Sequence, residues 1–357
     1  MHRTKVTNRS NFAALTIVAS VAFAACLSLS RATWAAETGV AYVSTASGLA
    51  VIDLGRLEVA RTVDLPSAVR GLAVTPDGKY VLTADESSGD VAVIDSSNFS
   101  VVRRVPIGKN PEFMRMQPDG AKAYVTFEPS SSGKPPGKGD KDDDSGTPAE
   151  VAAIDLRNWT AKSFFTGGRE TEGIEFSPDG KRLSVANEGD DTVTSYDKQT
   201  GKLLQTVDLH SLGSRPRGIK VSPDGTRYVV TMENSDTLVL LDPSLKVEKT
   251  VQVDKGPYGV AFDRSGQRLF VAAARAKMLQ VFDAKTFRKL ADIPVGQRCW
   301  HFSFTPDEAY ILVACGRSNE LRVVDAKTYQ PVKSISGLKL AWGVVTYPKA
   351  NGSLDAR

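Results

Sequence analysis

Histidine and cysteine are scarce in this sequence, with three of each among 357 residues. The chain has no CxxCH, GxSxG, GxGxxG or HExxH motif and no phosphate-binding P-loop. These absences exclude covalent haem attachment and the usual signatures of serine hydrolases, nucleotide-binding proteins and zinc proteases. Beyond residue 35 the only histidines are His210 and His301, so a metal site built from several histidines is also excluded.

Most of the chain has no excess of charge of either sign. The formal net charge of +4 comes from residues 1–35, which hold four basic residues and no acidic one. The neutral remainder gives no electrostatic reason to expect a nucleic acid or an anionic membrane as partner. It also lacks an apolar run long enough to span a bilayer, so we expect no membrane span there.

The first 35 residues have the pattern of a secretion signal. Arg3, Lys5 and Arg9 precede an uncharged apolar run at 12–29, and cleavage is expected after Ala35. An uncleaved membrane anchor and lipidation of Cys26 are the alternatives. The sequence therefore predicts export, with a periplasmic location.

The rest of the chain is a repeat. Each unit has four short alternating runs and a "PDG"-type turn, marked by Pro76, Pro118, Pro178, Pro223, Arg264, Pro306 and Pro348. The spacings are 42, 60, 45, 41, 42 and 42 residues, where the 60 holds an 18-residue insertion. Four strands in about 42 residues is the size of a propeller blade. The sequence predicts an all-β, seven-bladed β-propeller of four-stranded antiparallel blades.

The two ends of the repeat complete each other. The last unit stops after one strand, and residues 39–66 supply three, so N-terminal strands joining a C-terminal strand would close the ring. Closure removes exposed sheet edges. We expect one propeller domain over 36–348, a mobile insertion in blade two at 128–150, a C-terminal tail at 349–357, and a monomer.

Aspartates recur at the turns without indicating catalysis. One lies nineteen residues after the marker in most units, for example at Asp95, Asp197 and Asp325. Another follows the marker proline, as in Asp77 and Asp179. A carboxylate at such positions caps a turn by accepting backbone N–H groups. We assign these residues a structural role.

The innermost strands should present a ring of side chains at the mouth of the central funnel. Five residues before each marker, five of seven units have Gly, as close packing near the axis requires, whereas Phe113 and His301 depart from that rule. One position earlier, the ring is Arg70, Glu112, Glu172, Arg217, Tyr258, Trp300 and Trp342. With His301, it is predicted either to bind a small planar or anionic ligand or to form an interlocked salt-bridge ring.

A charged rim is expected outside this ring. Glu86, Glu128, Glu188 and Glu233 end the second strands of blades one to four, whereas Arg275 and Arg317 lie near the equivalent positions in blades five and six. Such a field could orient a charged partner protein, although an ordinary polar rim explains it too. In the insertion, Asp140, Asp142 and Asp144 are weak candidates for a hard cation.

Cys299 and Cys315 lie on adjacent strands of blade six, close to one rung apart. An exported protein favours their oxidation, so the sequence predicts a disulfide, with two buried thiols as the alternative. His301 is expected to be a polar group satisfied inside the channel, with a lone haem or metal ligand as the alternative.

Runs such as "YVLTAD" and "YILVAC" resemble the YVTN-type, WD40-like repeats of secreted bacterial propellers. The segment 298–345, with Trp300, His301, Trp342 and Gly343, more closely resembles PQQ-dependent catabolism-associated propeller proteins. That resemblance implies a non-catalytic periplasmic accessory protein that supports quinoprotein alcohol or methanol oxidation. It would bind a small ligand such as PQQ, or a quinoprotein dehydrogenase or cytochrome c, at the funnel. The acidic insertion departs from the family pattern.

Two other functions stay open at this point. One is a cofactor carrier similar to the haem domain of nitrite reductases, with His301 as axial ligand and Arg70 and Arg217 on the haem carboxylates. The other is a surface adhesion or interaction module, as for many YVTN repeats. Because no catalytic constellation is present in the sequence, we expect a binding protein rather than an enzyme.

Overall fold

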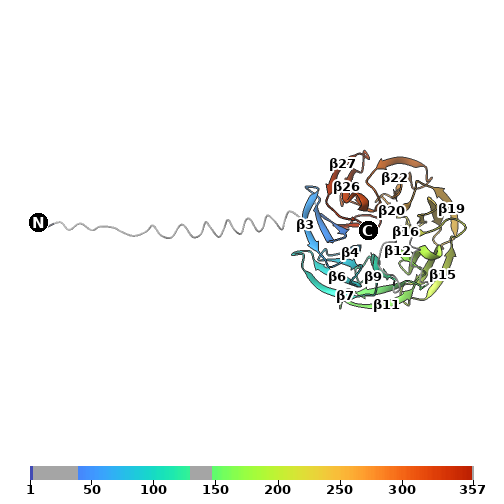
Figure 1. Ribbon diagram of the computed structural model, residues 1–357, viewed down its shortest axis with the longest axis horizontal. Helices are drawn as coiled ribbons and strands as arrows, with labels where there is room; N and C mark the ends of the chain where they lie inside the picture. Colours follow the sequence, from blue (N-terminus) through green and yellow to red (C-terminus); the bar gives the residue numbers. More distant parts are fainter. Residues whose placement is uncertain (3–38, 129–146, 356–357) are drawn as a thin grey trace.

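The computed structural model describes residues 1–2, 39–128 and 147–355. The expected cleavage site after Ala35, Cys26, and the insertion aspartates Asp140, Asp142 and Asp144 lie outside these ranges. Within them, no helix has the length and apolar character needed to cross a membrane. The described chain forms seven four-stranded antiparallel sheets arranged as blades around a ring (Figure 1), which confirms the predicted seven-bladed β-propeller.

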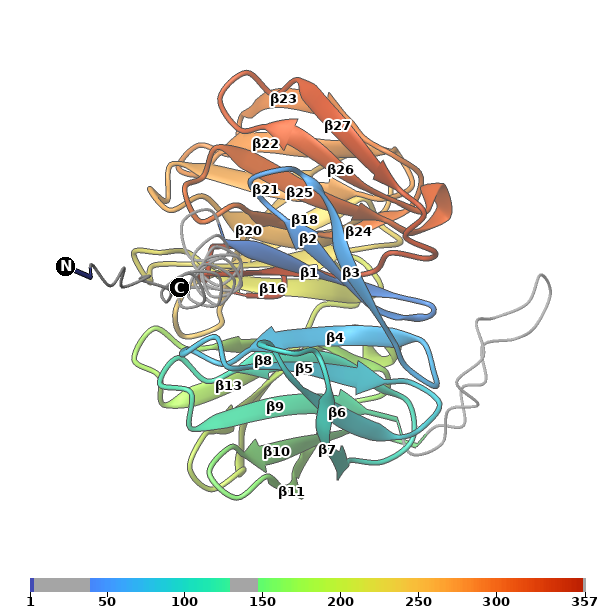
Figure 2. The same ribbon diagram turned by 90° about the vertical axis from the view of Figure 1, so that its left-hand side faces the viewer.

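The blades are numbered one to seven in the order of their innermost strands, and viewed edge-on they stack around a common axis (Figure 2). The innermost strands are β4 (Val69–Val74), β8 (Pro111–Met116), β12 (Thr171–Phe176), β16 (Pro216–Val221), β20 (Pro257–Phe262), β24 (Cys299–Phe304) and β28 (Val344–Tyr347). The second strands are β5 (Tyr80–Asp85), β9 (Lys122–Phe127), β13 (Arg182–Asn187), β17 (Tyr228–Met232), β21 (Arg268–Ala273), β25 (Tyr310–Cys315) and β1 (Val40–Thr45).

The third strands are β6 (Asp90–Asp95), β10 (Glu150–Asp155), β14 (Thr192–Asp197), β18 (Thr237–Leu241), β22 (Met278–Asp283), β26 (Glu320–Asp325) and β2 (Gly48–Asp53). The outermost strands are β7 (Val101–Pro106), β11 (Thr160–Thr166), β15 (Leu203–Asp208), β19 (Val247–Gln252), β23 (Lys289–Pro294), β27 (Pro331–Ser336) and β3 (Glu58–Asp64). Two short 3-10 turns, η1 (Glu188–Asp190) and η2 (Gly316–Ser318), follow the second strands of blades three and six.

Ring closure occurs in blade seven, as the ends of the repeat predict. Its strand order is β28-β1-β2-β3, and Val43 of β1 pairs with Val344 of β28. The same antiparallel ladder places Val40 opposite Tyr347. Strands from the two ends of the propeller therefore share one sheet, which leaves no innermost strand without a partner.

The hydrophobic core lies between neighbouring blades. Leu82 and Val91 of blade one, for example, pack in one cluster with Met114 and Val125 of blade two. Because each sheet is covered on both faces by its neighbours, the inner three strands are almost continuously buried, whereas the outermost strands are exposed along most of their length. This packing fixes the position of each innermost strand around the channel.

Close approach at the axis explains the predicted ring of glycines. A Cβ built on Gly71, Gly173 or Gly218 would lie 2.5 Å from a backbone carbonyl oxygen of the next innermost strand. Real Cβ atoms do not approach an oxygen so closely, so the inner strands can pack at this spacing only with glycine.

The turn aspartates have the expected structural role. Oδ1 of Asp95 accepts the backbone N–H of Ser97 at 2.8 Å, and Oδ1 of Asp77 accepts that of Lys79 at 3.0 Å. In blade five, where Arg264 replaces the marker proline, Asp263 takes over and accepts the N–H of Gln267 at 3.0 Å. These carboxylates are used by the scaffold and lie on the face opposite the funnel.

Candidate functional site

The funnel face consists of the loops that enter the innermost strands and the turns between second and third strands, such as residues 86–89 and 316–319. The predicted ring residues begin the innermost strands, except that Trp342 lies just before β28. Neighbours in the ring touch: Arg70 contacts Glu112, Arg217 contacts Glu172, and the Arg217 guanidinium lies 4.9 Å from the centroid of the Tyr258 ring. The structure thus brings the predicted residues together around one opening.

Arg217 is the centre of the charged part of the ring. Its guanidinium contacts Glu172 and Glu188 and donates from Nε to Glu233 Oε2 at 2.8 Å. Burial by itself would lower the pKa of Arg217, but Tyr258, Glu172 and Glu233 outweigh it and raise that pKa above its ordinary value. A fixed cation surrounded by several carboxylates is fully satisfied.

Arg70 is paired in the same way in blade one. It donates to Glu86 Oε1 at 2.9 Å and contacts Glu112. Both ring arginines are therefore occupied by carboxylates of this chain. An anionic ligand at the mouth would have to displace these partners, because the four charged residues of the ring are joined in salt bridges.

Carboxyl groups are crowded beside Arg70. The Asn110 amide donates to Glu128 Oε2 at 2.9 Å and to Glu112 Oε1 at 3.3 Å. Burial and the nearby Glu172 raise the pKa of Glu128 above its usual range. A buried carboxyl group whose pKa is raised is a candidate functional residue.

The four glutamates of the predicted acidic rim lie on the funnel face, but they are only slightly exposed. Glu188 contacts Arg215 and Arg217, and Glu233 accepts from Arg217 and lies 3.5 Å from Arg298. Side-chain exposure is 2% for Glu188, 8% for Glu233 and 11% for Glu86. These carboxylates act mainly within the ion-pair network.

Cations on the other side of the funnel face are exposed. Arg275 reaches back toward blade four and donates to the Glu233 carbonyl oxygen at 2.6 Å. Among the described residues, the side chains of Lys255, Lys277, Arg317 and Lys339 have no ion-pair partner. All four are exposed and lie in blades five and six or the loop leading into blade seven. We call these four residues the basic rim. The exposed basic rim thus lies over blades five to seven, whereas the glutamates over blades one to four are held in ion pairs with arginines.

A small open pocket of about 230 Å³ lies between blades three and four. It is lined by Glu170, Glu188, Gly189, Asp191, Ser214, Arg215 and Asn234. Asp191 accepts the backbone N–H of Arg215 at 2.7 Å, so its carboxylate helps to fix the loop that carries Arg215. In the part of the chain that the structure describes, no group of three or more His, Cys, Asp or Glu side chains is arranged to hold a metal ion.

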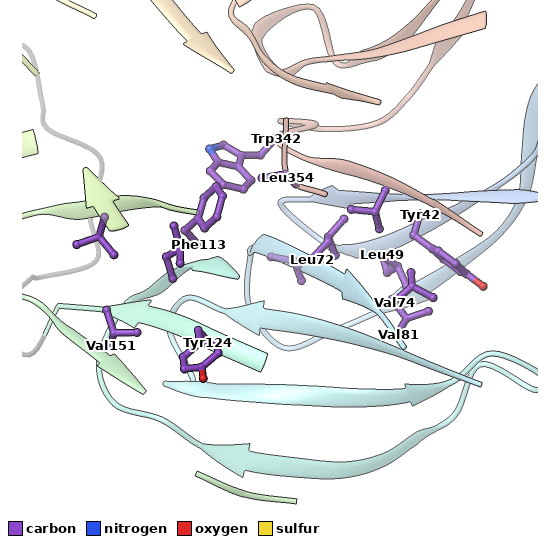
Figure 3. Packing of buried hydrophobic residues seen from close by; sticks show 14 of the residues in the cluster. Tyr42, Leu49, Leu72, Val74, Val81, Phe113, Tyr124, Val151, Trp342 and Leu354 are labelled. Atoms are coloured by element: carbon purple, nitrogen blue, oxygen red, sulfur yellow. The ribbon is translucent and has the colours of Figure 1, made fainter. Parts of the chain in front are cut away.

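His301 is sealed in the channel behind the mouth and is only 2% exposed. Its ring packs edge-on against Trp342 at 4.3 Å and Tyr258 at 5.3 Å, while Nδ1 lies 3.0 Å from Ser353 Oγ. The buried Nε2 has no hydrogen-bond partner among the described residues, so the expectation of a satisfied polar group is correct for Nδ1 only. Figure 3 shows Trp342 and Phe113 close together, with Leu354 beside them. Burial, with Lys220 and Arg217 nearby, lowers the pKa of His301 to about 3, so the imidazole is neutral.

These contacts do not fit a haem. An axial ligand needs an open side, whereas His301 is enclosed by aromatic rings and by residues 353 and 354 of the same chain. Arg70 and Arg217, the expected partners of haem carboxylates, are already paired with glutamates. Trp300 also packs within the fold, because its ring covers Gly316 so closely that a Cβ there would overlap it.

Two further features of blade six concern the predicted site. Cys299 and Cys315 lie directly opposite each other on β24 and β25 and form a disulfide. The tail beginning at Lys349 turns back into the channel, where Gly352 forms a β-bridge with Ser303. Sequence reasoning missed this second feature, because a short segment without a repeat pattern gives no periodic signal.

Comparisons with known proteins support the fold and leave the function open. A family model described as "Lactonase, 7-bladed beta-propeller" matches residues 102–244, which is less than half of the chain. No curated protein matches the sequence.

Several solved structures share the fold at low sequence identity. The periplasmic gluconolactonase of Pseudomonas aeruginosa superposes with a TM-score of 0.70 at 19% identity, covering 87% of this chain and 99% of that one. A putative 6-phosphogluconolactonase from Bacteroides uniformis gives 0.69 at 16% identity, covering 87% and 100%. The hydrazine synthase of Kuenenia stuttgartiensis gives 0.64 at 19% identity, covering 78% and 89%. At these identities the likeness concerns the fold alone.

Proposed function

We propose that this protein is an exported binding propeller that docks a partner protein on its funnel face, at the basic rim. The observation that carries the proposal is the exposed basic rim, whose four cations have no ion-pair partner among the described residues, whereas the glutamates over blades one to four are already paired with arginines. Exposed charges at fixed places orient an approaching partner and discourage wrong ones.

The pairing of the ring favours a protein over a small anion such as PQQ. Arg70 and Arg217 hold carboxylates at hydrogen-bond distance, so a free anion would have to break buried charge pairs to bind there. A protein partner can instead use the basic rim and leave the inner network intact.

The resemblance of Trp300, His301, Trp342 and Gly343 to the PQQ-associated propellers gives this proposal its biological context. We infer that the partner is a quinoprotein alcohol dehydrogenase or the cytochrome c that accepts its electrons, and that docking supports alcohol or methanol oxidation. The export signal expected in residues 1–35 would place the protein with such partners in the periplasm.

The proposal is tested by affinity capture from periplasm of cells grown on alcohol, with the tagged protein as bait. Lys277→Glu with Arg317→Glu reverses two cations of the basic rim that have no ion-pair partner among the described residues. We expect wild type to capture a quinoprotein or cytochrome and this variant to lose most of it.

A matched control has the same change of charge in the same blades. Lys285→Glu with Lys327→Glu alters exposed turn residues on the opposite face, and we expect it to capture as wild type does. Equal capture by both double variants, or no redox protein among the captured partners of wild type, would defeat the proposal.

Lactone hydrolysis is a second candidate, favoured by Glu128 and by the lactonase family match over residues 102–244. Here Glu128 would remove a proton from a water molecule as that water attacks the lactone carbonyl carbon. The ring C–O bond then breaks, and the leaving oxygen takes up the proton to give a hydroxy acid. Arg70, whose positive charge acts on Glu128, would help to stabilise the negative charge that develops on the carbonyl oxygen.

A pH-stat assay with glucono-δ-lactone separates the two candidates. If the protein is a lactonase, wild type accelerates hydrolysis above the spontaneous rate, and Glu128→Gln reduces that acceleration by about 100-fold or more. No acceleration by wild type removes this candidate and leaves the docking proposal untouched.

A further inference from the structure

The channel beneath the funnel contains the chain's own C-terminal segment, Lys349 to Asp355. Gly352 pairs with Ser303 of β24, and the Ser353 hydroxyl lies 3.0 Å from the Phe302 backbone nitrogen and 3.1 Å from its oxygen. The segment therefore forms backbone contacts with an innermost strand around one isolated β-bridge. In Figure 1 the C-terminal part of the chain lies at the centre of the ring.

Charged side chains hold the other side of the segment. Arg115 of β8 donates to the Leu354 carbonyl oxygen at 2.9 Å, and the Lys220 ammonium of β16 donates to that of Asp355 at 3.0 Å. Arg115 also donates from one guanidinium nitrogen to both carboxylate oxygens of Glu175 in β12, at 2.7 and 2.9 Å. Blades two, three and four thus contribute one buried charged residue each.

These residues occupy one register position, three residues before the blade marker. In the other four blades the same position is Ala73, Ala261, Ser303 or Val345. Three large charged side chains on one side of the channel and smaller ones on the other leave room for a chain segment along the second side. The asymmetry is therefore already present in the repeat, at a position that faces the channel.

The segment also fits its place closely. A Cβ on Gly352 would lie 2.9 Å from the Phe302 carbonyl oxygen and 3.0 Å from the Ser303 Cα. Leu354 is 2% exposed and belongs to the same core cluster as Phe113 and Trp342. Ser353 meets His301 Nδ1 at 3.0 Å and so fixes the orientation of that ring.

We propose that the channel is a peptide-binding site for a Gly-Ser-Leu-Asp sequence that pairs with β24 at the glycine and then turns, with the Gly352 N–H donating to the Asp355 carbonyl oxygen at 3.2 Å, and that residues 349–355 occupy it in cis. Recognition comes from backbone pairing with β24, from the two cations that bind carbonyl oxygens, and from the apolar pocket for Leu354. The bound segment closes the channel below the funnel and holds His301 in place. This site is separate from the funnel face and does not depend on the proposed docking function.

The test uses the full chain with a specific protease site inserted between Pro348 and Lys349. The protein is cut after folding, passed through gel filtration, and weighed by native mass spectrometry with and without excess synthetic peptide KANGSLDAR. We expect one peptide per chain, either retained or rebound. The same peptide with Gly352→Val should bind at least 10-fold more weakly, because its Cβ meets backbone atoms. Loss of the cut segment without rebinding, or equal binding of both peptides, overturns the proposal.

A second measurement needs no cleavage. In the uncut wild type, carboxypeptidase should remove Arg357 and Ala356 and then stop, leaving Asp355 in place. The uncut Gly352→Val chain should be trimmed further, while its circular dichroism stays that of a β-protein. Rapid trimming of the wild type through residue 353 would show that the segment has no specific site in the channel.

Discussion

His301 shows how burial sets the chemistry of a single residue. Burial, with Lys220 and Arg217 nearby, lowers its pKa to about 3 in the folded protein, whereas an unfolded imidazole titrates at about 6.5. Between these values the unfolded chain binds a proton that the folded chain does not. This residue therefore makes the free energy of unfolding fall as the pH is lowered through the window, and its stabilising effect is complete above it.

The corresponding prediction concerns His301→Phe, which keeps an aromatic ring in the cluster but cannot titrate. Urea unfolding at pH 7 and pH 5 should show a smaller loss of stability for the variant than for wild type. This range lies above the titration of the turn aspartates, whose pKa values are lowered, as for Asp95 by Ser97. The same loss of stability in both proteins would mean that His301 is charged in the fold.

Sequence reasoning succeeded for residues whose role repeats in every blade. The turn aspartates and the inner glycines recur because each blade needs the same local geometry, so their roles could be read from a single chain. The partners of Arg70 and Arg217 could not, because those ion pairs depend on distances between side chains of neighbouring blades. The sequence therefore predicted which residues surround the mouth, but left open whether they pair with one another or await a ligand.

At the scale of elements, the hairpin of β24 and β25 carries the disulfide, because antiparallel pairing places Cys299 opposite Cys315. Its sequence separation is 16 residues. A cross-link that closes a loop of this length restricts the unfolded chain and contributes about 3 kcal/mol to stability.

We therefore expect Cys299→Ala with Cys315→Ala to lower the free energy of unfolding by roughly 2–4 kcal/mol. A reductant should lower the melting temperature of wild type and leave that of the double variant unchanged. Equal sensitivity of both proteins to reductant would show that this disulfide does not stabilise the hairpin.

The C-terminal segment is an element that periodicity could not reveal. It follows the last repeat and does not match the pattern of any blade. Its role becomes visible only when Arg115, Glu175 and Lys220 are seen to face one channel. A signal was present in the sequence, since three charged residues occupy a position that is small or apolar in the other four blades. Reading it required knowledge that this position points to the axis.

For the whole molecule, ring closure through blade seven joins seven similar sheets into one body with two different faces. One face carries the aspartate-capped turns, which the scaffold uses, and the other carries the charged mouth. Because the loops of the funnel face vary from blade to blade while the turns repeat, function is expected on the variable face.

Site-specific photo-crosslinking tests docking at the funnel face most directly. A photoreactive amino acid is placed at Arg317 on the funnel face or at Lys327 on the opposite face, and periplasm is irradiated while cells grow on alcohol. Docking at the funnel face predicts a discrete adduct with a redox protein from position 317 and none from position 327. An adduct from position 327 alone, or no adduct from position 317, would contradict docking at the funnel face.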